Sequence, residues 1–214
     1  MNVPKFNNRK EKPLKLGVII AEFVGTFSLA YAVFASINGS LSAIPTGVIA
    51  GFTLFLAALS IGGISGAHIN PAVTLGLFSI RKISGRDAAF YLVSQFAGAL
   101  AALGVLTLVL HNHTIGVKSD ASNWTIFSSE MIGAIIFTFG VSAAVEQGLK
   151  KISAAALVGG SLTLGIIFAS IASNGIVNPA VSVTISSATW AYLFGPVVGA
   201  VIGMNLQHYM RKSS

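Results

Sequence analysis

Long apolar stretches alternate with short polar segments along the chain. They cover residues 16–37, 44–64, 88–110, 131–145, 153–173 and 190–206. A helix needs about 20 predominantly apolar residues to cross the hydrocarbon core of a bilayer. The pattern therefore predicts six membrane-spanning helices, of which the fourth is short.

Two further apolar segments each begin with the letters Asn-Pro-Ala-Val, at 70–73 and 178–181. Asn is a favoured helix N-cap, and Pro fits the first helical turn because its missing N–H has no partner there anyway. Each motif therefore predicts the start of a helix, which continues to about Ile80 in one case and about Ser187 in the other. Such helices are about 15 Å long, roughly half the thickness of the hydrocarbon core.

The two halves of the chain are related by duplication. The same spacing along the chain separates the members of four pairs: Glu22 and Glu130, Gly25 and Gly133, Ser65 and Ser173, Asn70 and Asn178. Each half, about 16–110 and 128–211, contains three predicted spans, so the second half must enter the membrane from the opposite side. Inverted repeats with interrupted segments place the functional site near the midplane, at the repeat interface.

The segments before the motifs, 62–69 and 174–177, are too rich in Gly and Ser or too short to be helical throughout. Irregular backbone is tolerated at membrane depth only where it is buried in protein or lines a watery cavity. We therefore expect the two half-length helices to enter from opposite faces and to meet tip to tip beside a pore. Their positive N-terminal ends would repel cations there.

Composition and charge agree with a membrane protein. Hydrophobic residues make up 54% of the chain and charged residues only 9%, against about 25% charged residues in soluble domains. If the N-terminus is cytoplasmic, only Lys118 of the 13 Lys and Arg residues falls on the outside. This asymmetry follows the positive-inside rule and predicts that both termini are cytoplasmic. A basic patch for nucleic acid would not produce this alternation, so no nucleic-acid partner is expected.

Several motifs together resemble those of the aquaporin and aquaglyceroporin family, also called major intrinsic proteins. They are SGAHINPAVT (65–74), NGIVNPAVSVT (174–184), AEFVGT (21–26), SEMIGAIIFTF (129–139), YLVSQFAGA (91–99) and YLFGPVVGA (192–200). The resemblance implies an all-α membrane protein in which residues 1–214 form one channel domain. It has six transmembrane helices and two re-entrant half-helices in an inverted repeat.

The resemblance also implies a passive channel for water and small uncharged solutes such as glycerol, with no cofactor. The channel would sit in the plasma membrane, in contact with lipid, as a homotetramer with one pore per chain. The pore centre would be formed by Asn70, Pro71, Ala72, Asn178, Pro179 and Ala180.

Four positions outside the centre set the narrowest point of the family's pore, and here they are Ala50, Ile166, Gly175 and Val181. The first is usually aromatic in the family and the last is typically Arg, so this chain departs from the pattern. We expect a constriction that is wide or at least apolar, without the fixed donors of an Arg.

Three outcomes are compatible with that constriction. Water passes if the opening is broad, and larger neutral solutes such as glycerol pass too. Alternatively, ammonia, hydrogen peroxide or dissolved gases are preferred, because an apolar constriction holds water weakly.

Glu22 and Glu130 lie within apolar spans, where carboxylates are costly and usually functional. They would either relay protons or bind a coupling ion, or accept hydrogen bonds from backbone N–H groups of the re-entrant loops. We favour the second interpretation, since both halves carry the residue. His68 lies two residues before Asn70 and, by the resemblance, beside the pore.

Other functions find less support in the sequence. A secondary transporter is also built from inverted repeats but needs a coupling-ion site, and a purely structural junction role is a more distant alternative. An enzyme finds no support, because no nucleophile with a base, phosphate loop or metal cluster is evident; His111 and His113 lack partners in metal-ligand spacing. Three glycosylation sequons, at Asn38, Asn112 and Asn123, fall on the predicted outer side.

Overall fold

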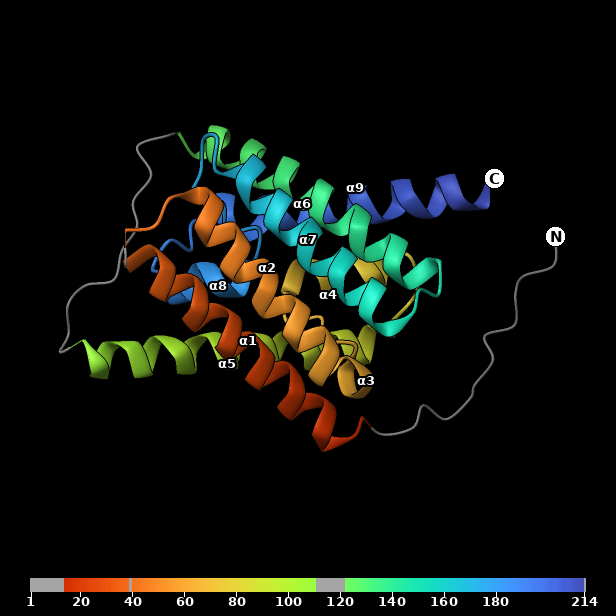
Figure 1. Cartoon of the computed structure of the whole chain (residues 1–214), viewed down its shortest axis with the longest axis horizontal. Helices are drawn as coiled ribbons and strands as arrows, with labels where there is room; N and C mark the ends of the chain where they lie inside the picture. Colours follow the sequence, from red (N-terminus) through yellow and green to blue (C-terminus); the bar gives the residue numbers. More distant parts are fainter. Residues whose placement is uncertain (1–13, 39, 111–121, 214) are drawn as a thin grey trace.

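The computed structural model of the protein describes residues 14–38, 40–110 and 122–213. Within these ranges every regular element is a helix (Figure 1). In chain order the helices are α1 (Leu16–Asn38), α2 (Ala43–Ser60), α3 (Gly62–Ser65), α4 (Pro71–Ser79), α5 (Gly85–Val109), α6 (Asn123–Glu146), α7 (Lys151–Ala169), α8 (Pro179–Thr184) and α9 (Trp190–Lys212).

Six helices are long, and they match the six predicted spans in order. Five of them, α1, α2, α5, α6 and α7, are long and apolar enough to cross a membrane. The sixth, α9, has 23 residues but carries Asn205, Gln207 and His208 in its second half. Its polar end projects beyond the rest of the bundle (Figure 1).

Two predicted boundaries were wrong. The fourth span is not short: α6 has 24 residues and starts at Asn123, because the hydroxyl of Ser122 caps it by accepting a hydrogen bond from the N–H of Thr125 at 3.3 Å. Conversely, α8 stops at Thr184 rather than near Ser187. There Ser186 takes a left-handed conformation (φ 53°), and the N–H of Ser187 turns back to the carbonyl of Ser182 at 2.9 Å.

Small residues let the long helices pack in pairs. Helix α1 packs against α5, and α6 packs against α9 in the other half. A Cβ atom added to Gly98 would collide with the backbone carbonyl of Phe23, and one added to Gly199 would collide with that of Met131. The backbones therefore touch where only Gly fits. Helix α7 joins the halves by packing against both α2 and α6.

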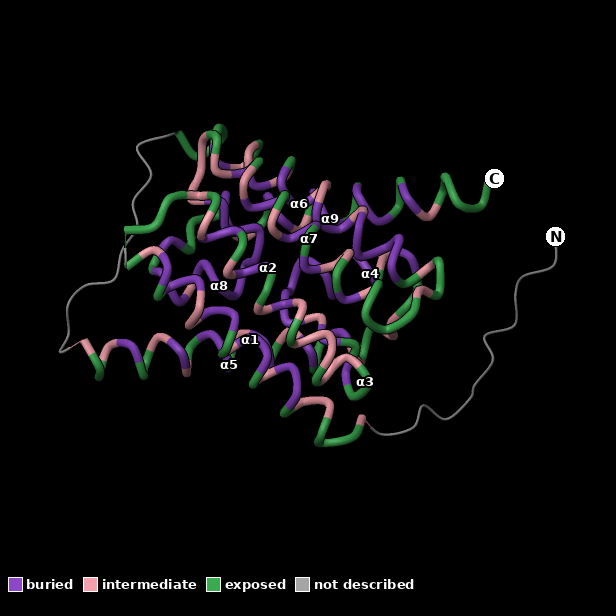
Figure 2. The backbone as a smooth tube through the Cα atoms, viewed as in Figure 1, coloured by how far each residue is buried: buried purple, intermediate pink, exposed green. Residues whose placement is uncertain are grey.

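Burial follows stripes along the long helices, with buried and exposed residues alternating once per turn (Figure 2). Many outward-facing side chains are large and apolar, among them Ile20, Phe52, Val93, Leu108 and Phe194. A surface of this kind matches lipid rather than water, as expected for an integral membrane protein. The sequons at Asn38 and Asn123 lie on exposed helix ends; Asn112, His111, His113 and Lys118 lie outside the described residues.

Candidate functional site

The two short helices α4 and α8 begin at the Asn-Pro-Ala motifs. Asn70 Oδ1 accepts a hydrogen bond from the N–H of Ala72 at 2.8 Å. Asn178 Oδ1 accepts one from the N–H of Ala180 at 3.0 Å and a longer one from Val181 at 3.4 Å. Each Pro occupies the first helical position. This is the N-cap geometry that the two motifs predict.

The same two Asn side chains tie the helix tips together. Asn70 Nδ2 donates to the carbonyl of Val177 at 2.9 Å, and Asn178 Nδ2 donates to the carbonyl of Ile69 at 3.1 Å. The bonds are reciprocal: each amide reaches the carbonyl just before the other Asn. An amide nitrogen carries two hydrogens, so each Asn retains one donor after forming this contact.

The residue before each Asn is held in a left-handed conformation, with φ of 40° at Ile69 and 44° at Val177. Both are β-branched residues, for which positive φ is unfavourable. Such strain costs on the order of 1–3 kcal/mol per residue and persists only where the surroundings impose it. In this conformation the carbonyl of Ile69 accepts a hydrogen bond from Asn178, and that of Val177 accepts one from Asn70.

Buried carboxylates impose these conformations. Glu22 accepts hydrogen bonds from the N–H groups of His68 (3.0 Å) and Ile69 (2.7 Å), and also from the Ser65 hydroxyl (2.6 Å). In the second half Glu130 accepts from Ile176 (2.9 Å), Val177 (2.6 Å) and the Ser173 hydroxyl (2.7 Å). The two carboxylates thus accept hydrogen bonds from backbone N–H groups of the loops before α4 and α8.

A polar network continues from Glu22 toward His68. Gln95 Nε2 donates to Glu22 at 2.7 Å and to Thr74 Oγ1 at 2.9 Å. His68 Nδ1 lies 3.2 Å from the same Thr74 oxygen, and its ring stacks at a tilt against Tyr91, with centroids 4.7 Å apart. His68 is therefore held by one ring nitrogen and one ring face. Sequence reasoning missed Thr74 and Gln95, although both lie inside the motifs quoted above.

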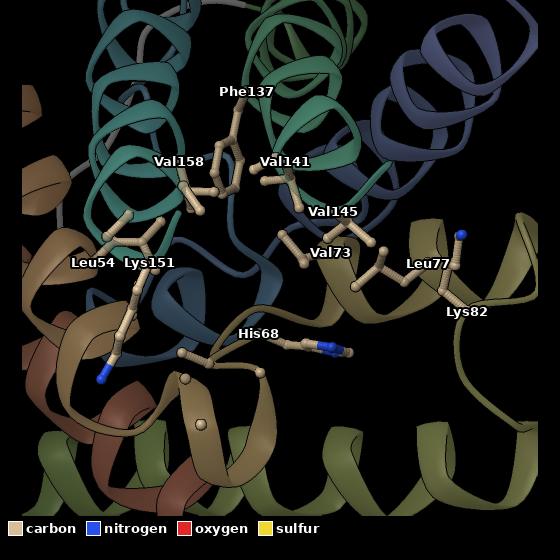
Figure 3. A pocket seen from close by; sticks show the side chains of 18 residues that line it. Leu54, His68, Val73, Leu77, Lys82, Phe137, Val141, Val145, Lys151 and Val158 are labelled. Carbon is tan, nitrogen blue, oxygen red and sulfur yellow. The ribbon is translucent and has the colours of Figure 1, made fainter. Parts of the chain in front are cut away.

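A cavity of about 420 Å³ leads to this site. It extends from Lys82 and Lys151 at one end of the molecule to His68 and Val73, next to the helix tips. Its walls are largely apolar: Phe137, Val141 and Val158 face His68 across the space (Figure 3). The sequence did not identify these wall residues, because nothing in an apolar run distinguishes a side chain facing a cavity from one facing lipid.

Beside the cavity an ion pair joins three segments. Lys82, after α4, pairs with Glu146 at the end of α6, and His208 Nδ1 of α9 lies 3.2 Å from the other oxygen of Glu146. Sequence reasoning did not predict this cluster, because its members are distant along the chain.

The four expected constriction positions lie in α2, α7, α8 and the loop before α8. Solvent reaches almost none of Ala50 (0% exposed), Ile166 (2%) and Val181 (1%), which belong to one cluster of buried apolar side chains. Gly175 is also buried, with φ of 62°, and a Cβ added there would lie 2.7 Å from the carbonyl of Ile166. The three side chains are apolar and are not open to solvent.

Comparisons with known proteins show the family to which the chain belongs. The family model described as "Major intrinsic protein" matches residues 9–206. The chain belongs to the major intrinsic protein family. It is 32% identical over 202 residues to Aquaporin NIP1-1 of Zea mays, covering 86% of this chain and 71% of the relative. It is 30% identical over 206 residues to Probable aquaporin NIP7-1 of Arabidopsis thaliana, covering 88% of this chain and 74% of the relative.

Among solved structures, the fold is similar to that of the aquaglyceroporin from Plasmodium falciparum, with a TM-score of 0.73. The match covers 92% of this chain and 96% of that one at 20% identity, so it shows the shared fold. Membership of the major intrinsic proteins makes this chain an integral membrane protein and a channel rather than an enzyme. The expected family resemblance and the aquaporin-like all-α fold are thereby confirmed.

Proposed function

We propose that the chain is a passive channel for water and small uncharged solutes, whose pore passes the point where α4 and α8 meet. The reciprocal hydrogen bonds of Asn70 to the Val177 carbonyl and of Asn178 to the Ile69 carbonyl are the observation that carries this proposal. These bonds bring two helix N-termini to one buried point, and the 420 Å³ cavity comes as near to it as His68 and Val73, which flank Asn70 in the chain.

Exclusion of ions and protons follows from the same point. Two helix N-termini contribute about half a positive charge each and repel cations. The remaining amide hydrogen of Asn70 and that of Asn178 donate to a passing molecule. A water that accepts both bonds is poorly oriented to relay a proton.

The constriction bears on the choice of permeant. Ala50, Ile166 and Val181 offer no side-chain donors, and their near-complete burial leaves little room for water. A narrow apolar passage dewets easily, which favours ammonia or dissolved gases. The second candidate function is a channel that conducts water slowly and prefers ammonia, gases, glycerol or hydrogen peroxide, of which glycerol and hydrogen peroxide would need a wider opening.

Removal of the Val181 side chain tests the constriction. In proteoliposome swelling assays Val181→Ala should raise water permeability several-fold, because it removes apolar bulk where the passage is closed. Val181→Arg restores donors and should lower the ratio of ammonia to water permeability. Val183→Ala, a half-buried position two residues along α8, serves as the control and should change neither. Equal permeabilities for the wild type and both Val181 variants would refute this assignment of the constriction.

We further propose that residues 1–214 form one channel domain built from inverted repeats, 16–110 and 128–211. The matching contacts of Glu22 and Glu130 with the two loops support this organisation. Both termini would be cytoplasmic, with the protein in the plasma membrane as a homotetramer with one pore per chain. Mass measurement of the purified protein and protease protection of tagged termini test these points.

The rival transporter needs a free carboxylate for its coupling ion. Both oxygens of Glu22 and of Glu130 already accept backbone hydrogen bonds or side-chain hydrogen bonds at 2.6–3.0 Å. Because these oxygens already have hydrogen-bond partners, they favour the channel over the transporter. Saturable uptake driven by an ion gradient would favour the transporter instead.

A further inference from the structure

A second cavity lies on the outside of the bundle, between α1 and α5. This groove has a volume of about 400 Å³ and shares no lining residue with the cavity beside His68. Its walls are apolar and come from the first two turns of α1 and the second to fourth turns of α5: Ile19, Ile20 and Phe23 of α1 and Phe90, Val93 and Ala97 of α5.

The polar side chain that lines the groove already has a hydrogen-bond partner. Ser94 Oγ, the polar side chain that lines it, donates to the backbone carbonyl of Ile19 at 2.5 Å. One turn further on, Gly98 brings α5 against the backbone of Phe23. Because the Ser94 hydroxyl already has a hydrogen-bond partner and the walls are apolar, the groove suits a hydrocarbon chain and not water or a polar solute.

Two cations lie one helical turn before residues that line the groove. Arg86 lies one turn before Phe90, and its guanidinium carbon is 5.9 Å from the centre of the Phe90 ring. Lys15 lies one turn before Ile19, at the start of α1. Both are exposed, and neither pairs with a carboxylate among the described residues. The nearest acid in sequence is Asp87, in the first turn of α5.

We propose that this groove binds an anionic phospholipid, with one acyl chain along the apolar walls and the phosphate between Lys15 and Arg86. Charge complementarity selects the occupant, since an apolar groove alone would accept any lipid tail. Basic pockets between transmembrane helices on the cytoplasmic side suit anionic headgroups. An Arg held over an aromatic ring presents its donors in a fixed plane toward phosphate oxygens.

The proposal is tested by native mass spectrometry of the full-length protein in detergent. Phosphatidylglycerol and phosphatidylcholine with identical acyl chains are titrated in parallel. The wild type should retain phosphatidylglycerol over phosphatidylcholine. Each cation removed, by Lys15→Gln or Arg86→Gln, should reduce that preference about fivefold. The control is the double variant Lys150→Gln/Lys212→Gln, which removes two exposed cations away from the groove and should keep the wild-type preference.

A second variant tests the groove itself. Ala97 is exposed on the lipid-facing side, so Ala97→Trp fills the groove without disturbing the core and should reduce retention of both lipids. Equal retention of both lipids by the wild type, or loss of preference in the control as large as in the groove variants, would overturn the proposal. A changed subunit number in Ala97→Trp, with lipid retention intact, would identify a second copy of the chain as the occupant and would overturn it as well.

Discussion

Single side chains hold this site in a conformation that its backbone would not keep alone. Ile69 and Val177 are strained, and the N–H of each donates to a buried carboxylate, that of Glu22 or Glu130. The Asn side chains then donate to the carbonyls of these residues and so join the two loops. In each half, a strained residue, the buried Glu that accepts from its N–H and the Asn that follows it therefore act together.

Glu130→Gln tests that unit at one residue. The amide presents a donor where the carboxylate accepts from the N–H groups of Ile176 and Val177. At least one buried donor loses its partner, which costs about 1–3 kcal/mol, and we expect a corresponding loss in the free energy of unfolding. Chemical or thermal unfolding in detergent measures it. Ser128→Ala, whose exposed hydroxyl bonds only its own helix, is the control; equal stability of the two variants would contradict the support role.

At the scale of elements, two helix pairs with backbone contact, α1 with α5 and α6 with α9, give the bundle its rigid frame. The short helices α4 and α8 pack against this frame, α4 on α9 and α8 on α5. Thr184 Oγ1 reaches across to the carbonyl of Ala99 at 2.9 Å. Each half-helix is thus positioned by a helix from the other half of the chain.

Gly199→Ala should disrupt the frame. The added methyl group would meet the carbonyl of Met131 and the Ala134 side chain, and overpacking of this kind costs about 1–3 kcal/mol. Gly160→Ala is a matched helical control, because a Cβ there meets nothing within 4 Å and Ala favours the helix. We expect a lower unfolding midpoint for Gly199→Ala only. A similar midpoint for both variants would argue against a close contact of α6 with α9.

At the scale of the whole molecule, the proposed pathway runs through the cavity beside His68, whose lining includes residues at the ends of α2, α6 and α7. The ion pair of Lys82 with Glu146, extended to His208, ties the rim to α9. The external groove lies on another face, so lipid and permeant would use separate surfaces.

Filling the cavity beside His68 should abolish transport and leave the fold intact. Ala154 lines the cavity, whereas Ala156 is exposed on the other side of the same helix. Ala154→Trp is expected to reduce water and ammonia permeability of proteoliposomes to the level of protein-free vesicles. Ala156→Trp should leave both unchanged. Normal permeability in Ala154→Trp, at equal reconstitution, would show that the cavity is not part of the pathway.

Local chemistry made much of this predictable. The apolar stretches matched six long helices in order, and Asn followed by Pro marked the starts of α4 and α8, since capping depends on adjacent residues. The length of α6 was missed because its first turns carry polar residues capped by Ser122, which hydropathy does not register. The end of α8 was missed because a left-handed Ser186 terminates it.

The sequence by itself determined the membrane environment, the repeat and the two caps, because hydrophobicity, spacing and capping are properties of neighbouring residues. Only the tertiary structure decided that Asn70 bonds Val177 while Asn178 bonds Ile69. It alone showed Ala50, Ile166 and Val181 closed off from solvent, and an apolar groove between α1 and α5. These features depend on which surfaces of distant segments come into contact, and that is settled when the whole chain packs.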